Sequence, residues 1–310
     1  INDGNYHAFQ VSPTKSYFLD IFSNLDIPSI TQIVNNQGDL VTSLLVSKNP
    51  LANYDIGKIE ISKIKTDNNT ELNTRLIKPY NFDESKKYPV LIYVYNGPGV
   101  QLIRNNWLGS APLWMYYLAN QGYIVFSIDG RGSENRGRDF EQVIFRELGK
   151  IEMRDQMKGY DYLIQNNFVD KNRIAVHGWS YGGFMTTNLL LNYPEFFTCG
   201  VAGGPVTNWS YYEIMYTERY MDHPSDNKLG YEKTNLLKKV DLLEVPLLMI
   251  HGLLDDIVVP KHSLEFIKES VDNNIQMDYF IYPGHPHNVR GKDRLHLLKK
   301  IIDYIRENNN

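Results

Sequence analysis

Apolar and polar positions alternate differently in the two ends of the chain. Four short apolar runs, at residues 7–12, 17–24, 29–35 and 40–47, read as strands separated by turn residues. Four antiparallel strands make one blade of a β-propeller, and a single blade cannot bury both of its faces. We therefore expect residues 1–55 to be the last blade of a longer propeller or to pack on the domain that follows.

From about residue 56 apolar strands alternate with helical patterns. The expected strands lie at 59–66, 72–78, 89–95, 123–129, 173–178, 198–202, 246–251 and 277–282, and the expected helices at 112–121, 152–166, 182–191, 261–272 and 292–307. In the second helix, Met153, Met157, Tyr160 and Leu163 fall near one face. Continuous apolar strands between helices indicate a mostly parallel sheet covered on both faces. Residues 56–310 are thus predicted to form an α/β-hydrolase fold.

One stretch carries the clearest chemistry. The strand that begins near Arg173 ends in Gly178-Trp179-Ser180-Tyr181-Gly182, and a helical pattern follows. Strand, sharp turn and helix is the context of a nucleophile elbow. The flanking glycines let neighbouring backbone pass, the turn exposes the Ser180 hydroxyl, and the backbone N–H of Tyr181 points to where an oxyanion would form.

The expected partners of Ser180 are an acid and then a histidine, in that chain order. Asp255 and Asp256 both follow an apolar strand, and either could be the acid. His285 and His287 share the loop after the next strand, and either could be the base. The spacing alone leaves both pairs open.

The composition of the chain argues against several classes of function. The 310 residues are 42% hydrophobic and 22% charged, with a net charge of -4, as in ordinary globular proteins. The near-neutral pI argues against nucleic acid as a partner, and no apolar run is long enough for membrane contact within this chain. No metal-ligand cluster or phosphate-binding loop is apparent, so we expect no cofactor and no metal. The opening residues 1–4 show no targeting signal, and the single Cys199 is expected to be a buried apolar filler.

Residues 206–235 form an insertion of mixed polar and aromatic character. Its rings belong to Trp209, Tyr211, Tyr212, Tyr216 and Tyr220. They could form a structural cluster or a substrate pocket, and their spacing favours neither.

The run Gly178-Trp179-Ser180-Tyr181-Gly182-Gly183 is more specific than a generic elbow, and it resembles the dipeptidyl peptidase IV family of the prolyl oligopeptidase group of serine peptidases. Residues 93–98, 129–133, 212–221 and 251–256 agree with this resemblance, which covers essentially the whole chain. It implies that the chain is the C-terminal catalytic part of a longer protein, preceded by the closing propeller blade.

The resemblance also implies roles for individual residues. It makes Asp255 the acid and His287 the base, and it places the Tyr95 hydroxyl beside the Tyr181 N–H in the oxyanion hole. The implied pocket for the residue before the scissile bond consists of Tyr181, Val206, Trp209, Tyr212, Tyr216 and Val258. Arg219 matches an arginine near the substrate backbone.

Two differences from the dipeptidyl peptidase pattern leave the length of the released peptide open. Ile257 stands where dipeptidyl peptidases have an asparagine that helps to hold a substrate carbonyl. Residues 212–216 and 285–297 look most like bacterial prolyl tripeptidyl peptidases, in which a residue at the position of Glu213 is implicated in holding the substrate amine.

The expected function is a serine exopeptidase that releases N-terminal di- or tripeptides after proline or alanine. Its expected partners are peptide substrates with proline near the N terminus. The alternatives are another serine hydrolase of this fold, such as an acylaminoacyl peptidase or an esterase, and a non-catalytic peptide-binding homologue. The resemblance further implies a homodimer in the full-length form and a periplasmic, secreted or cell-surface location.

Overall fold

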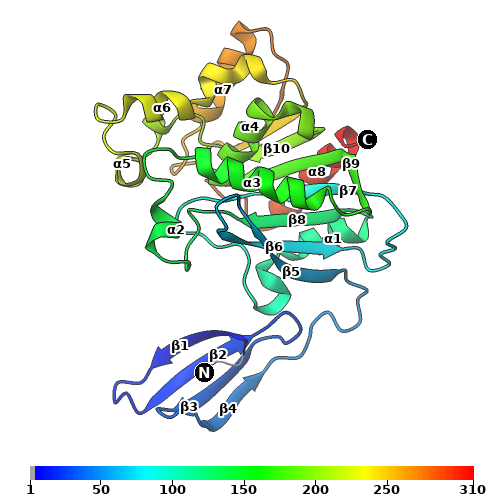
Figure 1. Cartoon of the computed structure of the whole chain (residues 1–310), viewed down its shortest axis with the longest axis vertical. Helices are drawn as coiled ribbons and strands as arrows, with labels where there is room; N and C mark the ends of the chain where they lie inside the picture. Colours follow the sequence, from blue (N-terminus) through cyan, green and yellow to red (C-terminus); the bar gives the residue numbers. More distant parts are fainter. Residues whose placement is uncertain (1–3) are drawn as a thin grey trace.

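A computed structural model describes residues 4–310, so residues 1–3 of the expected N-terminal segment lie outside the described range. Four strands form an antiparallel sheet in sequential order: β1 (Tyr6–Val11), β2 (Tyr17–Ser23), β3 (Ile30–Asn35) and β4 (Leu40–Val46). Figure 1 shows this sheet as a separate layer at one end of the molecule. The expected four-stranded segment is confirmed.

The larger part is built on an eight-stranded sheet with the order β12-β11-β10-β9-β7-β8-β6-β5. Its strands are β5 (Lys58–Lys65), β6 (Glu71–Lys78), β7 (Tyr88–Tyr93), β8 (Ile124–Asp129), β9 (Val169–Trp179), β10 (Cys199–Gly203), β11 (Leu247–Gly252) and β12 (Asp278–Tyr282). The strands from β7 to β12 run parallel, whereas β5 and β6 pair antiparallel at one edge. Because parallel strands share one carboxyl edge, the loops that follow them meet there.

Helices cover both faces of this sheet, as predicted. On one face α1 (Leu113–Asn120) and α8 (Asp293–Asn308) bury apolar side chains against the strands. On the other face α3 (Lys150–Leu163), α4 (Tyr181–Asn192) and α7 (Lys261–Asp272) do the same (Figure 1). Cys199 is buried within the first of these two cores. The α/β-hydrolase fold is therefore confirmed.

Three short helices were not expected from the pattern: α2 (Arg138–Gln142), α5 (Ile214–Met221) and α6 (Lys228–Thr234). The last two lie in the 206–235 insertion and start at polar caps, since the side chains of Glu213 and Asn227 accept hydrogen bonds from backbone N–H groups of the first turn. Helices this short have too few turns to show an apolar period.

The buried face of α3 also differs from the expectation. Tyr160 and Leu163 are buried, but Met153 and Met157 lie only partly buried at the rim of the core. The polar residues Glu152, Asp155 and Gln156 take the interior positions instead. Within residues 4–310, no helix is long and apolar enough to cross a bilayer.

Candidate active site

Ser180 occupies a sharp turn between β9 and α4, with φ 62° and ψ -118°. This positive-φ conformation is strained for a residue with a Cβ and is typical of functional sites. A Cβ at Gly178 would lie 2.4 Å from the carbonyl oxygen of Val94, and one at Gly182 would lie 2.3 Å from the same oxygen. Only glycine fits these two positions, so the turn depends on the flanking residues of the motif.

Asp255 follows β11 and is 4% exposed. Its Oδ1 accepts hydrogen bonds from the backbone N–H groups of Ile257, at 3.0 Å, and Val258, at 2.9 Å. Burial alone would raise the pKa of this carboxyl, but hydrogen bonds from His251 and His287 outweigh it and hold the pKa well below its usual range. Asp255 is therefore a carboxylate near neutral pH. Its neighbour Asp256 is exposed.

His287 lies in the loop between β12 and α8 and is 7% exposed. Its Nδ1–H donates to Asp255 Oδ2 at 2.6 Å, which leaves Nε2 as the ring nitrogen able to accept a proton. The indole N–H of Trp179 donates to the His287 carbonyl at 2.9 Å and so ties this loop to the strand that carries the elbow. The arrangement holds the imidazole in one tautomer.

The competing His285 has another partner. Its Nε2 lies 2.9 Å from the Asp293 carboxylate. His251 also lies beside Asp255, with its Nε2 3.2 Å from Asp255 Oδ2, but it is fully buried and lies 2.7 Å from both the Ser263 hydroxyl and the Val258 carbonyl. The geometry thus separates the two pairs that the spacing left open and brings Asp255 and His287 together.

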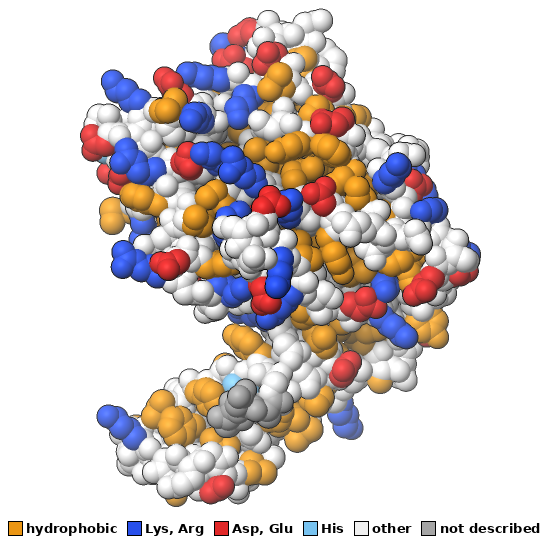
Figure 2. Space-filling view, viewed as in Figure 1, with side chains coloured by type: hydrophobic (Ala, Val, Ile, Leu, Met, Phe, Trp, Pro, Cys, Tyr) orange, Lys and Arg blue, Asp and Glu red, His pale blue; other side chains and the backbone are white. Residues whose placement is uncertain are grey.

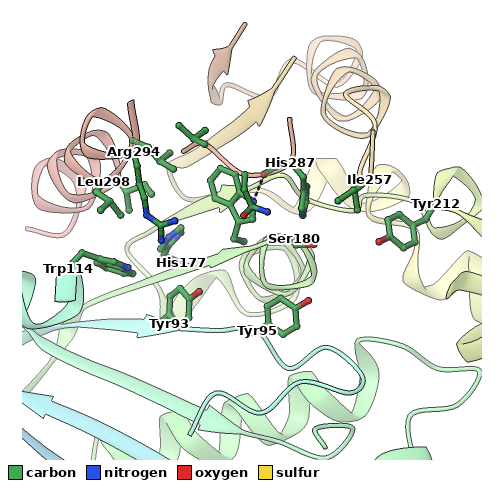
Figure 3. Close-up of a pocket in the computed structure, with 15 residues that line it drawn as sticks. Tyr93, Tyr95, Trp114, His177, Ser180, Tyr212, Ile257, His287, Arg294 and Leu298 are labelled. Atoms are coloured by element: carbon green, nitrogen blue, oxygen red, sulfur yellow. Dashed lines mark hydrogen bonds between the residues drawn. The ribbon is translucent and has the colours of Figure 1, made fainter. Parts of the chain in front are cut away.

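Ser180 and His287 line one cavity of about 480 Å³ (Figure 3). Among residues 4–310 no hydrogen bond joins the Ser180 hydroxyl to the His287 ring. Such bonds are often long in ligand-free enzymes and tighten only when substrate binds. The two side chains therefore face a shared space in which an acyl group could be placed.

Tyr95 lies just beyond β7 and lines the same cavity. Burial raises the pKa of its phenol to about 12, and the contact with Ser180 opposes that rise. A neutral phenol is a hydrogen-bond donor. Tyr181 opens α4, so its backbone N–H has no acceptor within the helix. These two groups could supply the donors of an oxyanion hole.

Four rings from the elbow and the insertion pack together, and we call Tyr181, Trp209, Tyr212 and Tyr216 the aromatic box. The Trp209 ring is stacked on Tyr216 at 6.0 Å between centroids and lies edge-on to Tyr212 at 5.7 Å. Tyr181 is 5.5 Å from Trp209. Val206 and Val258 are buried in the same core, and of these six residues only Tyr212 lines the Ser180 cavity.

The predicted residues Glu213 and Arg219 do not line the Ser180 cavity. Glu213 is exposed, and its carboxylate caps α5 by accepting from the Met215 N–H at 2.9 Å. Arg219 lines a separate cavity of about 530 Å³ beside Pro98 and Tyr220. Ile257, at the place of the missing asparagine, contributes to the wall of the Ser180 cavity.

Glu152 is a site residue that the sequence reasoning missed. This fully buried carboxyl accepts from the Tyr181 hydroxyl at 2.6 Å and from the Gly149 N–H at 3.0 Å, while its second oxygen has no partner among the described residues. Burial raises its pKa to about 7. Glu152 thereby anchors a ring of the aromatic box. The sequence feature that could have identified Glu152 is its position in the first turn of α3, three residues after Gly149.

We expect Glu152 to make stability depend on pH. Its carboxyl loses a proton near pH 4.5 when unfolded but near pH 7 when folded, so its contribution to stability is complete below pH 4.5 and is lost as the pH rises to 7. Glu152→Gln removes this titration. The stability of the variant relative to the wild type should therefore rise by up to about 1.4 kcal/mol per pH unit across that window. Urea unfolding of both proteins at pH 5 and pH 7 measures it, and an equal difference at both values would contradict the assignment.

The doubly covered sheet, the elbow and the acid–imidazole pair define a hydrolase of the α/β-hydrolase class. The sequence profile of the prolyl oligopeptidase family matches residues 111–310. The chain belongs to the prolyl oligopeptidase family, a family of serine peptidases.

Known relatives agree with this placement. Dipeptidyl peptidase 8 from Mus musculus is 33% identical over 98% of this chain and 36% of its own length, and prolyl endopeptidase FAP from Bos taurus is 35% identical over 84% and 34%. A solved structure of a putative dipeptidyl aminopeptidase IV from Bacteroides ovatus has a TM-score of 0.96 at 47% identity, covering 98% of this chain and 43% of that one. Dipeptidyl peptidase 4 from Porphyromonas gingivalis has a TM-score of 0.93 at 31% identity, covering 98% and 44%. The chain thus spans about a third of the length of its curated relatives.

Proposed function

We propose that the full-length protein is a serine exopeptidase that releases short N-terminal peptides after proline, and less readily after alanine. In this mechanism His287 takes the proton of Ser180 as the hydroxyl attacks the scissile carbonyl. Asp255 holds the imidazole tautomer and stabilises the imidazolium. The imidazole then protonates the leaving amine, and water activated at His287 hydrolyses the acyl-enzyme.

The observation that carries this proposal is the 2.6 Å hydrogen bond between His287 and Asp255 at the rim of the cavity that exposes Ser180. The three side chains come from the loops after β9, β11 and β12, which meet at one edge of the sheet. Tyr212 brings the aromatic box to the wall of this cavity. We propose that its flat apolar ring, backed by Trp209 and Tyr216, receives a proline ring, whose nitrogen has no hydrogen to donate.

Three chromogenic substrates test the proposal on the full-length enzyme: Gly-Pro, Ala-Ala-Pro and an acetyl-blocked analogue on the same leaving group. An exopeptidase should cleave a substrate with a free amine and discriminate against the blocked one. The dipeptide and tripeptide substrates separate the two release lengths. Preference for the blocked substrate would instead support an acylaminoacyl peptidase.

Tyr95→Phe should lower kcat by about 10²-fold, the effect of removing one oxyanion donor. The substitution keeps the ring and removes only the hydroxyl that faces Ser180. Steady-state kinetics with the best of the three substrates measure it, with Tyr80→Phe as a control at an exposed position. An unchanged kcat would remove Tyr95 from the oxyanion hole.

We further propose that residues 1–55 are the closing blade of a propeller in the full-length protein and that residues 56–310 are the catalytic domain. Every residue of β4 is exposed in this chain, and Figure 2 shows apolar side chains gathered on the small sheet. Such a surface is typical of an interaction site. The full-length enzyme is proposed to be a homodimer, which sedimentation equilibrium tests; a monomer would contradict that part.

A further inference from the structure

The Ser180 cavity continues past the catalytic groups into a space that the proposed mechanism does not use. Tyr93, Trp114, His177 and Arg294 line this part, which we call the Arg294 hollow. They come from β7, α1, β9 and the first turn of α8. Figure 3 shows all four to one side of Ser180 and the Tyr212 ring of the aromatic box on the other side.

The floor of the hollow is aromatic and uncharged. Tyr93, Trp114 and His177 touch one another edge to face, with centroids 5.7 to 5.8 Å apart. His177 Nδ1–H donates to the Val201 carbonyl at 2.7 Å, and burial lowers the pKa of this ring to about 4. Near neutral pH the ring is therefore neutral, with Nε2 as its remaining acceptor.

Arg294 is the permanently charged side chain among the residues that line this cavity. No carboxylate is among the residues that line it, and no ion pair or side-chain hydrogen bond engages the Arg294 guanidinium within residues 4–310. The adjacent Asp293 pairs with His285 at 2.9 Å. In Figure 3 the guanidinium reaches from α8 toward His177. A planar fork of donors over an uncharged floor suits a carboxylate.

The direction in which a substrate would leave follows from the proposed function, on which this inference rests. His287 protonates the leaving amine, so the chain beyond the scissile bond must pass on the imidazole side. The loop that carries His287 continues through Asn288 and Val289 to Arg294 in α8, and these three residues line the cavity. The aromatic box on the opposite side receives the residue before the bond.

We propose that the Arg294 hollow binds the first residues of the leaving peptide and that Arg294 binds a carboxylate there. That carboxylate has two sources with the same chemistry, the side chain of an acidic residue just after the scissile bond or the C-terminal carboxylate of a short peptide. The enzyme would therefore prefer acidic leaving segments or very short substrates.

Two pairs of peptides test this on the full-length enzyme, all with the N-terminal segment that it cleaves best. One pair has Asp or Asn directly after proline and an amidated end. The other has a single glycine after proline, with a free or an amidated C-terminus. The wild type should favour the carboxylate of at least one pair about five- to tenfold in kcat/KM, the effect of a partly solvated charge pair. The preference should weaken at high salt.

In Arg294→Gln the ratio of the two kcat/KM values within the favoured pair should fall to about one. Because both values come from the same enzyme preparation, the fraction of active enzyme cancels in this ratio. Arg290→Gln is the matched control: it removes an equal charge from an exposed side chain that does not line the cavity, and the ratio should persist. Ratios near one in the wild type, or a ratio retained in Arg294→Gln, would overturn this inference while peptide cleavage leaves the proposed function standing. Failure to cleave any of the four peptides would contradict the proposed function, and the inference with it.

Discussion

Replacing Ser180 with alanine should lower the turnover of the full-length enzyme by about 10⁴-fold or more, because no acyl-enzyme can form without the hydroxyl. The substitution removes one oxygen and leaves the backbone of the elbow in place, so the thermal midpoint should change little. Turnover of the best chromogenic substrate is the measurement.

Ser210→Ala is a suitable control for that experiment. Ser210 lies near the aromatic box, its side chain is exposed, and the hydrogen bond at this residue comes from its backbone N–H. Its replacement should leave turnover nearly unchanged. Turnover of Ser180→Ala within tenfold of the wild type would show that another group is the nucleophile.

The second large effect concerns the two histidines of one loop. His287→Ala should also lower turnover by about 10⁴-fold or more, since it removes both the proton acceptor of Ser180 and the donor to the leaving amine. His285→Ala should have a far smaller effect, because it breaks only a partly exposed pair with Asp293, and such pairs contribute at most about 1 kcal/mol.

The pair of variants decides between the histidines because they differ by two positions in the same loop. Both are measured with the same substrate, and the thermal midpoint of each shows whether the loop remains folded. Near-normal turnover in His287→Ala together with a large loss in His285→Ala would reverse the assignment.

The periodicity of apolar residues was sufficient to predict the long helices and the strands of the large sheet. Continuous apolar strands and the long helices come out close to their expected bounds because their patterns repeat over several turns or pleats. The short helices α5 and α6 depend on single capping residues instead. In α3 the expected methionines lie at the rim, because buried Glu152 and Asp155 accept hydrogen bonds from Tyr181 and Arg131, and no local pattern encodes these bonds.

The candidate site could be predicted from the sequence only in part, because some of its contacts join residues that are far apart in the chain. The elbow is local, so its glycines could be recognised from the motif. Spacing could not choose between Asp255 and Asp256, since neighbouring residues of a turn point in different directions and the choice depends on a histidine 32 positions away. The Arg294 hollow joins α1, β7, β9 and α8, which become neighbours only when the sheet forms.

The most direct test of the central claim is covalent labelling of the folded full-length protein with a fluorophosphonate, followed by peptide mass spectrometry. We expect one adduct, on Ser180, formed much more slowly in the His287→Ala variant and absent from Ser180→Ala. A folded wild-type protein that carries no adduct on Ser180, or carries it on another serine, would show that Ser180 is not the nucleophile.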